Sequence, residues 1–389
     1  MSRLSLEDAV AIEGGPLVLD KSLPGLPAEI IAHTSATLAF LVNVFLHNLQ
    51  DREAGIFVAL TQSSGLGCRV RQLDNDASVV LVPAGMIGRL RTLCRTLLRY
   101  WDKEHHVLLA NSPLDKINEN EWQVPPRLVA LFDQNQSGEQ FWKQLQELDD
   151  SLDLEARFNP DLPELIHLGV VFLLCHEFAH VFFRHFEFLA EVQRTRPDDV
   201  NRIRRGLELH ADSFAGTWAT TIFLAQVGKD ADIASLNRGF LRQSYVVTLI
   251  MAMFDAQKKF VGLYDTGDYN HPLIRREIFA DACQNEVSLL GQEFLDFWQE
   301  VEATGWKRAV EAFAELNLEI MQGVFGEIPK DKLATPVQAM TYGAGAATGT
   351  LQKILNEGVE LLEDVKQQVA AFNKKFEPRD AAAESQPSD

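Results

Sequence analysis

Residues 168–183 read LGVVFLLCHEFAHVFF, an apolar stretch that contains the motif His176-Glu177-Phe178-Ala179-His180. On a helix, residues four apart share one face, so both imidazoles can reach the same metal ion. Glu177 lies about a hundred degrees round the helix, where its carboxylate can contact a water bound to that metal. The alternative is a buried helix that happens to carry two histidines. Burying these ionisable groups costs on the order of several kcal/mol unless they are paired or bind a metal, which favours a metal site.

The chemistry expected at this motif is hydrolysis assisted by zinc. Zinc accepts histidine nitrogen and carboxylate oxygen in tetrahedral geometry and leaves one position for water. A bound zinc ion lowers the pKa of that water towards neutrality. Glu177 would then take its proton and pass it to the leaving amine.

The residues after the motif exclude one class of zinc peptidase. A metzincin has Gly three residues and His six residues after the second motif histidine. Those two positions hold Phe183 and Phe186 here, and His185 is one place away from the required position. On a continuing helix, His185 would point elsewhere, so the third ligand must come from another segment.

The segment Glu208-Leu209-His210-Ala211-Asp212 supplies the next candidates. Glu208 and Asp212 are four residues apart and share a helix face. One carboxylate could bind zinc, while the other could hold the outer N–H of a ligand histidine. His210 lies on the opposite side of the helix and is the minor candidate. The residues alone do not decide between Glu208 and Asp212.

This combination, HExxH followed by ExxAD, resembles the gluzincin metallopeptidases, particularly the HtpX and CAAX-prenyl-protease group. The resemblance covers roughly residues 163–280 and implies that Glu208 is the third zinc ligand and that Asp212 supports a ligand histidine. Those relatives are membrane proteins, whereas this chain is expected to lack a spanning helix. The phage-exclusion Lit-like peptidases are loosely similar, since they carry HExxH in a cytosolic protein.

The resemblance also extends to residues 269–276, which read YNHPLIRR. In the related group a His-Pro pair is followed by arginine. His271 is therefore the candidate that stabilises the oxyanion formed when water attacks a carbonyl. Tyr264 and Tyr269 are the alternatives for the same role.

Composition limits the other classes of function. The chain has 389 residues with 46% hydrophobic and 23% charged residues, which is typical of a globular protein. Its formal net charge of −19 argues against nucleic acid or anionic lipid as the main partner. No signal peptide or spanning segment is expected, so we predict a soluble, cytoplasmic protein of undetermined oligomeric state. None of the cysteines has CxxC spacing, which argues against a cysteine zinc site or a disulfide framework: Cys68, Cys94, Cys175 and Cys283.

The predicted fold class is α+β: a mainly α-helical, zincin-like metallopeptidase with a small N-terminal β-sheet. Residues 1–125 form the N-terminal α/β part, whose first 28 residues look irregular. Residues 126–285 form the helical zinc-binding part, residues 286–375 a C-terminal helical part, and residues 376–389 a disordered tail. Three runs rich in β-branched residues predict the strands: residues 55–60, 68–73 and 78–82.

Three local predictions follow from these segments. Residues 78–82 could supply a sheet edge that binds an extended substrate, or could simply pack in the core, and both interpretations are held equal. The arginines of the helix at residues 86–101 are expected to form a solvated face. The helix that carries the motif is expected to end near residues 185–191, with residues 187–200 partly looped, so that Glu208 can return to the histidines.

The predicted function is that of a zinc-dependent endopeptidase acting on a protein or peptide substrate. One alternative is a non-catalytic protein of the same fold, stabilised by its metal and active through regulatory contacts. Another is a metal-dependent hydrolase of a non-peptide substrate. The intact Glu177 favours an enzyme, because a structural metal site has no use for a base.

Overall fold

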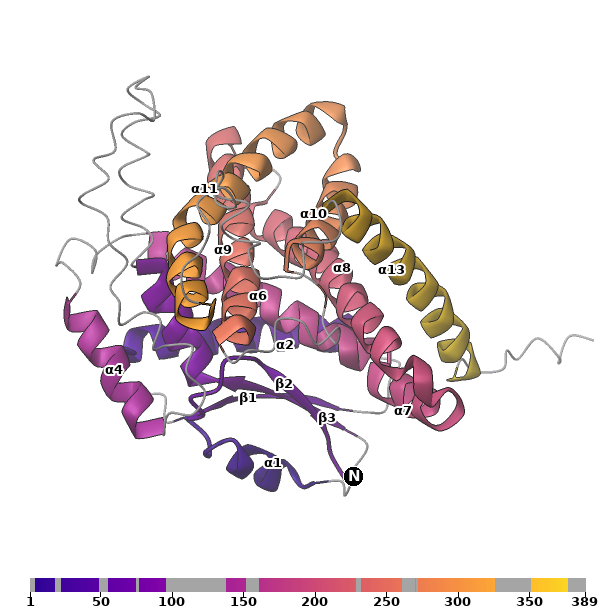
Figure 1. Cartoon of the computed structure of the whole chain (residues 1–389), viewed down its shortest axis with the longest axis horizontal. Coiled ribbons are helices and arrows are strands. Elements are labelled where there is room, and N and C mark those ends of the chain that lie inside the picture. The colour runs from indigo at the N-terminus through magenta and orange to yellow at the C-terminus, as the bar shows by residue number, and fades with distance from the viewer. Residues whose placement is uncertain are drawn as a thin grey trace, which may run out of the picture.

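The computed structural model describes residues 4–17, 22–48, 55–74, 77–95, 138–151, 161–228, 232–260, 270, 272–325 and 351–376. Helices predominate in these residues, and three strands form one small sheet close to the N-terminus (Figure 1). The predicted α+β class with a small N-terminal sheet is therefore confirmed. The predicted tail beyond Phe376 lies outside the described residues.

The sheet consists of β1 (Ile56–Thr61), β2 (Arg69–Gln72) and β3 (Ser78–Pro83), in the order β1-β3-β2. β3 pairs parallel with β1 and antiparallel with β2. All six residues of β3 are buried, as expected of an apolar strand covered on both faces. The interpretation of residues 78–82 as a sheet edge is therefore wrong, because β2 occupies the edge and β3 the centre.

Helices cover both faces of this sheet (Figure 1). One face packs against α1 (Leu6–Ile12), a helix whose N-terminus is capped by the side chain of Ser5. The expectation that residues 1–28 are irregular is thus wrong for this segment. The other face meets α2 (Ala28–Asn48) and α6 (Asp161–Phe182) through the largest apolar cluster of the described chain.

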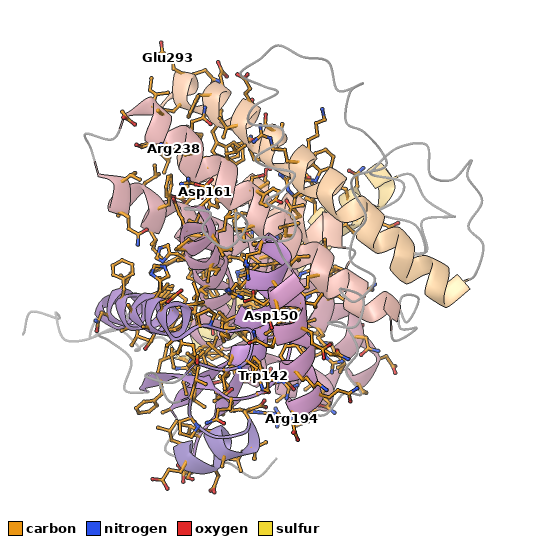
Figure 2. The ribbon with its side chains drawn as sticks, turned by 90° about the vertical axis from the view of Figure 1, so that its left-hand side faces the viewer. Trp142, Asp150, Asp161, Arg194, Arg238 and Glu293 are labelled. Atoms are coloured by element: carbon orange, nitrogen blue, oxygen red, sulfur yellow. The ribbon has the colours of Figure 1, made fainter. Side chains whose placement is uncertain are left out.

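The helix α6 passes through the centre of the molecule. Fifteen of its residues are buried, and a helix that is apolar all round is typical of a core position. It packs against α2, α8 (Val200–Val227) and α9 (Ile233–Phe260). In its first turn, Asp161 (labelled in Figure 2) and Glu164 form ion pairs with Arg242 of α9. α6 therefore holds the HExxH motif in a fixed position.

The remaining helices surround this centre. They are α4 (Gly138–Ser151), α10 (Pro272–Ser288), α11 (Gln292–Phe325) and α13 (Leu351–Asn373). The backbones of α8 and α10 approach each other closely. A Cβ atom on Gly216 of α8 would lie 2.4 Å from the carbonyl oxygen of Phe279 on α10. Only glycine allows this contact, which brings α10 against the back of the motif region.

The chain turns sharply directly after the motif helix. α6 ends at Phe182 and α7 (His185–Thr195) begins three residues later. Between them Arg184 has φ 54° and ψ 41°, the left-handed conformation that non-glycine residues seldom adopt. The prediction that the motif helix ends early is confirmed, although α6 ends at Phe182, a few residues before the predicted range of 185–191. The prediction that residues 187–200 are partly looped holds for residues 196–199, where Arg196 and a 3-10 turn (Pro197–Asp199) join α7 to α8, but residues 187–195 are helical.

The arginines of the helical segment 84–95 are buried, so the predicted solvated face is wrong. Arg89 donates to the carbonyls of Ser64 and Gly65. Arg91 and Arg95 both form ion pairs with Asp149 of α4. Burial of an arginine is tolerated when carbonyl or carboxylate partners satisfy its guanidinium, and these partners come from distant parts of the sequence.

Two helical stretches of the described chain are long and apolar enough to span a bilayer: Ala28–Phe45 within α2, and Asp161–Phe182. Length and composition alone are weak support for a span, because core helices of soluble proteins have the same character. The second stretch is 78% buried within the protein and the first 39%. The predicted absence of a spanning helix stays a prediction.

Candidate metal centre

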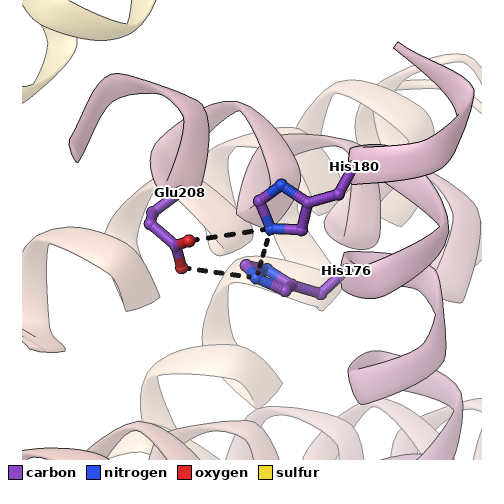
Figure 3. Close-up of side chains that lie close together, drawn as sticks. All are labelled: His176, His180 and Glu208. Atoms are coloured by element: carbon purple, nitrogen blue, oxygen red, sulfur yellow. Dashed lines mark hydrogen bonds and ion pairs between the residues drawn. The ribbon is translucent and has the colours of Figure 1, made fainter. Parts of the chain in front are cut away.

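Two helices bring three candidate ligands to one point (Figure 3). His176 and His180 project from the last turns of α6, and Glu208 projects from the facing helix α8. Their ligand atoms all lie within 4.8 Å of one another. Both histidines are buried and Glu208 is half-buried. The structure thus places together the three residues that the sequence nominates as ligands.

The spacing of these atoms fits a single zinc ion. The Nε2 atoms of His176 and His180 are 3.2 Å apart. The carboxylate oxygens of Glu208 lie 3.5 Å from Nε2 of His176 and 3.7 Å from Nε2 of His180. Two atoms bound tetrahedrally to one zinc at about 2.0–2.1 Å are about 3.3–3.4 Å apart. Two imidazoles and one carboxylate also form a common donor set of catalytic zinc.

Asp212 lies behind His176 and not among the ligand atoms. Its Oδ1 is 2.9 Å from Nδ1 of His176, the nitrogen that faces away from the centre. Arg275 of α10 donates to both carboxylate oxygens of Asp212, at 2.7 and 2.9 Å, and reaches Oε2 of Glu208 at 3.5 Å. Glu208 thus faces the two Nε2 atoms, whereas Asp212 contacts Nδ1 of His176, and this arrangement favours Glu208 as the third ligand.

A second pair of histidines lies behind His180. Nδ1 of His185 is 2.9 Å from Nδ1 of His180. The other ring nitrogen of His185, Nε2, is 3.1 Å from Nδ1 of His210 on α8. His210 therefore points away from the candidate ligands, as its place on the helix predicted. His185 does not join the ligand atoms either, but it contacts the back of one of them.

The centre lies in a cleft of about 450 Å³ whose wall includes the edge strand β2. Glu177 lies at the floor beside His176 and His180. Apolar side chains from four elements also line the cleft, beside the arginines Arg69, Arg71 and Arg275: Val70, Phe172, Leu173, Phe186 and Phe254. The cleft therefore combines the ionisable groups of the centre, apolar walls and the strand that lies at the edge of the described sheet.

Comparison with protein-family models, with curated proteins and with solved structures finds no match to this chain. The resemblance to the gluzincins therefore depends on the motifs and on the geometry of the centre.

Charge at the centre is unbalanced in favour of a cation. Around the candidate ligands, the described residues provide three carboxylates, Glu177, Glu208 and Asp212, against the guanidinium of Arg275. Arg69 and Arg71 also line the cleft, but both are paired with Glu13. Buried charges of one sign require a counter-charge. A divalent metal ion would supply the two positive charges that are lacking.

The pKa values show how protons respond to this imbalance. Burial opposes the charged form of His176, yet the carboxylates of Asp212 and Glu208 raise its pKa to about 10. Burial raises the pKa of Glu177 to about 7. The pKa of Glu208 is instead lowered: burial acts against this, but His176, His180 and Arg275 outweigh it. Protons on His176 and Glu177 thus take the place of the missing positive charge, and a metal ion would displace the proton on His176.

His180 and His185 stay neutral at neutral pH. Burial lowers the pKa of His180 to about 4. Burial also lowers the pKa of His185 well below its ordinary value, with further contributions from His180 and His210. A neutral imidazole is the form that binds metal ions.

Sequence reasoning missed two groups of this centre. Arg275 was visible in the YNHPLIRR segment, but only the register of α10 against α8 shows that it holds Asp212. His185 was set aside because a straight helix would direct it elsewhere, and the turn at Arg184 changes that direction. The candidates for the oxyanion, His271, Tyr264 and Tyr269, lie outside the described residues, so their roles stay predictions.

Proposed function

We propose that this chain is a zinc-dependent metallopeptidase of gluzincin type with a zincin-like catalytic part. The observation that carries this proposal is the convergence of His176, His180 and Glu208 at zinc spacing, on the floor of a cleft that also contains Glu177 and an edge strand. When bound, zinc supplies a Lewis acid that makes water nucleophilic near neutral pH and polarises a carbonyl.

Glu177 acts as the general base and afterwards as the general acid. Its side chain lines the cleft beside the two candidate ligand histidines, which is where a base must lie to accept the proton of the attacking water. The base lies on the same helix turn as His176 and His180, so its position relative to both is fixed by the helix. His271, which directly precedes the first residue of α10, remains our candidate for stabilising the oxyanion.

An extended peptide is the substrate that fits the wall of the cleft. Within the described residues β2 pairs along its length with β3 alone, and the isolated bridge between Leu4 and Leu73 lies just beyond the strand. Its outer side could therefore offer backbone N–H and C=O groups to a further strand. Residues 67–71, which include most of β2, line the cleft together with the motif residues. A peptide bound along this edge would place its backbone next to Glu177, and its apolar side chains would contact the aromatic walls.

Activity of the zinc-loaded protein against a panel of unstructured proteins and peptides tests this proposal. We expect cleavage by the wild type and none by Glu177→Gln, because the amide cannot accept the proton of the attacking water. The same variant should retain zinc, since Glu177 is not among the ligand atoms. The matched control Glu187→Gln replaces a glutamate on α7 that does not line the cleft, and should cleave like the wild type.

The outcome also separates the two alternatives. Suppose that the wild type and Glu177→Gln contain equal zinc and that neither cleaves any protein, peptide or ester probe. This result would contradict the peptidase and favour a metal-stabilised interaction protein. Cleavage of ester or other small probes alone, dependent on Glu177, would favour a hydrolase of a non-peptide substrate.

A further inference from the structure

The two candidate ligand histidines are held from behind by different chemistry. Nδ1 of His176 faces the carboxylate of Asp212, itself held by Arg275. Nδ1 of His180 faces a neutral ring, His185, at 2.9 Å. A histidine that binds a metal through one nitrogen usually donates the N–H of the other to a fixed acceptor, which sets its tautomer and ring orientation. The acceptor for His180 has no assigned role in the proposed peptidase.

The hydrogen-bond geometry fixes where the protons lie in this second arrangement. If His180 binds the metal through Nε2, its remaining proton is on Nδ1. Nδ1 of His185 must then accept, which places the proton of His185 on Nε2. That nitrogen is 3.1 Å from Nδ1 of His210, which accepts in turn. Three neutral rings thus form one directed chain, from His180 through His185 to His210.

The surroundings of His185 are built to keep it in this place. Its side chain is only 1% exposed and that of His210 is 7% exposed. The ring of Phe183 lies 4.4 Å from that of His210 and stacks on His185 at 5.9 Å. The left-handed conformation of Arg184 turns the chain so that His185, five residues after His180, reaches back to it. A histidine kept only for packing would not need both ring nitrogens aligned with other ring nitrogens.

We propose that His185 and His210 are positioning residues of the metal centre, which hold His180 in the tautomer and orientation that present Nε2 to the metal. This inference rests on the proposed function, since it assumes a metal at the centre. It adds to that function a support for His180 that is independent of Asp212. It also explains why α7 folds back against α8 directly after the motif helix.

Zinc affinity and the visible spectrum of the cobalt-substituted protein test this role. His185→Phe keeps an aromatic ring but removes the acceptor, and we expect an affinity loss of about 10–100-fold with an altered cobalt spectrum. His185→Gln can still accept from His180 and donate to His210, so its affinity and spectrum should return close to those of the wild type. His210→Phe removes only the far end of the chain and should give a smaller loss than His185→Phe.

The matched control is His167→Phe. His167 is half-buried on α6, the helix that also carries His180, and it forms hydrogen bonds with Thr37 and Gln226. It lies outside the metal centre, so the zinc affinity of this variant should equal that of the wild type. Urea unfolding of the metal-free variants shows which of them are folded. If His185→Phe does not fold, the positioning role is tested by comparing the zinc affinity and cobalt spectrum of His210→Phe with those of the wild type.

Each outcome bears on one of the two proposals. If the folded His185→Phe variant has the zinc affinity and cobalt spectrum of the wild type, the positioning role is overturned and the proposed peptidase is not affected. If His185→Phe does not fold, the same result for His210→Phe overturns the role. A wild type that binds neither zinc nor cobalt would overturn the proposed function, and this inference with it. Loss in His185→Phe with recovery in His185→Gln supports the chain, because a purely structural role would not restore the spectrum.

Discussion

Glu177 lies where the apolar core of α6 meets the cleft. Burial is the main cause that raises the pKa of its carboxyl from an ordinary 4.5 to about 7; the nearby Glu208 raises it further, while His176 and Arg275 lower it. The folded protein therefore retains the proton on Glu177 over a pH range in which the unfolded chain has lost it. Stability falls as pH rises through this range, because the unfolded state gains the favourable ionisation first.

We therefore expect Glu177→Gln to stabilise the metal-free protein, and to do so more at pH 8 than at pH 4.5. One pKa unit corresponds to about 1.4 kcal/mol, and Glu177 keeps some contact with solvent. A gain of about 2 kcal/mol in the free energy of unfolding at pH 8 is the expected size. Urea denaturation in the presence of a chelator from pH 4.5 to pH 8 measures it. A difference that does not change with pH would contradict this account of Glu177.

At the residue scale, the sequence predicts the parts of the centre that follow helix periodicity. Positions four apart on α6 and on α8 give His176 with His180, and Glu208 with Asp212. The contacts of Arg275 and His185 depend instead on where separate helices lie relative to each other. Periodicity within one helix contains no information on that placement.

The break between α6 and α7 determines which side chains reach the centre. It depends on Arg184 in the left-handed region, where a Cβ atom is unfavourable by roughly 1–2 kcal/mol. The guanidinium of Arg184 also lies over the ring of Phe376, at 4.4 Å from its centroid. A substitution at this position therefore changes both the backbone preference and one side-chain contact.

Comparing Arg184→Ala with Arg184→Gly isolates the backbone preference, because both variants lose the contact with Phe376. Inside a helix alanine is favoured over glycine by about 1 kcal/mol. At Arg184 we expect the reverse, with the glycine variant more stable by about 1 kcal/mol. Urea unfolding of the two proteins gives the sign directly. A more stable alanine variant would show that residue 184 does not hold this conformation.

At the element scale, the predicted segments agree with the structure where the pattern is local. The three runs rich in β-branched residues, at 55–60, 68–73 and 78–82, correspond to β1, β2 and β3. The wrong predictions concern contacts with other segments. Residues 78–82 lie at the centre of the sheet and not at its edge, and arginines of segment 84–95 pair with Asp149 instead of facing solvent. Strand order and distant partners are tertiary properties that a single segment does not encode.

Besides the small cluster between α1 and the sheet, two larger apolar clusters divide the described molecule. The larger surrounds α6 and includes residues of the sheet, α2, α9 and α11. The smaller joins α7, α8 and α10 to the C-terminal helix α13. α13 also contacts the turn after the motif, because the side chain of Asn373 donates to the carbonyl of Phe183 at 3.2 Å. A helix far along the sequence thus supports the turn that places His185.

Phe372→Ala should weaken this support. Phe372 is buried, and its ring centroid lies 5.4 Å from that of Phe188 on α7. Truncating a buried phenylalanine costs about 3–5 kcal/mol, and we expect a loss near the lower limit because Phe372 lies close to the end of its helix. The matched control, Phe294→Ala on α11, removes a ring that is 41% exposed and should change stability by less than about 0.5 kcal/mol.

Thermal or urea unfolding compares these two variants, and zinc affinity provides the functional readout. Phe372→Ala should also lower zinc affinity, since α7 carries His185. Equal stability of the two variants would mean that α13 does not brace the turn after the motif. The docking of α13 against α7 cannot be predicted from helix periodicity, because the pattern of apolar residues in one helix does not identify the surface on which they pack.

The central claim, that His176, His180 and Glu208 hold one metal ion, is tested most directly by elemental analysis of the purified protein. The protein is prepared without chelator or histidine tag, alongside Glu208→Ala and Glu177→Gln. We predict about one zinc per chain in the wild type and in Glu177→Gln, and clearly less in Glu208→Ala. Of the two glutamates, Glu208 contributes a ligand atom and Glu177 does not. No metal in the wild type after zinc is supplied, or equal zinc in Glu208→Ala, would contradict the claim.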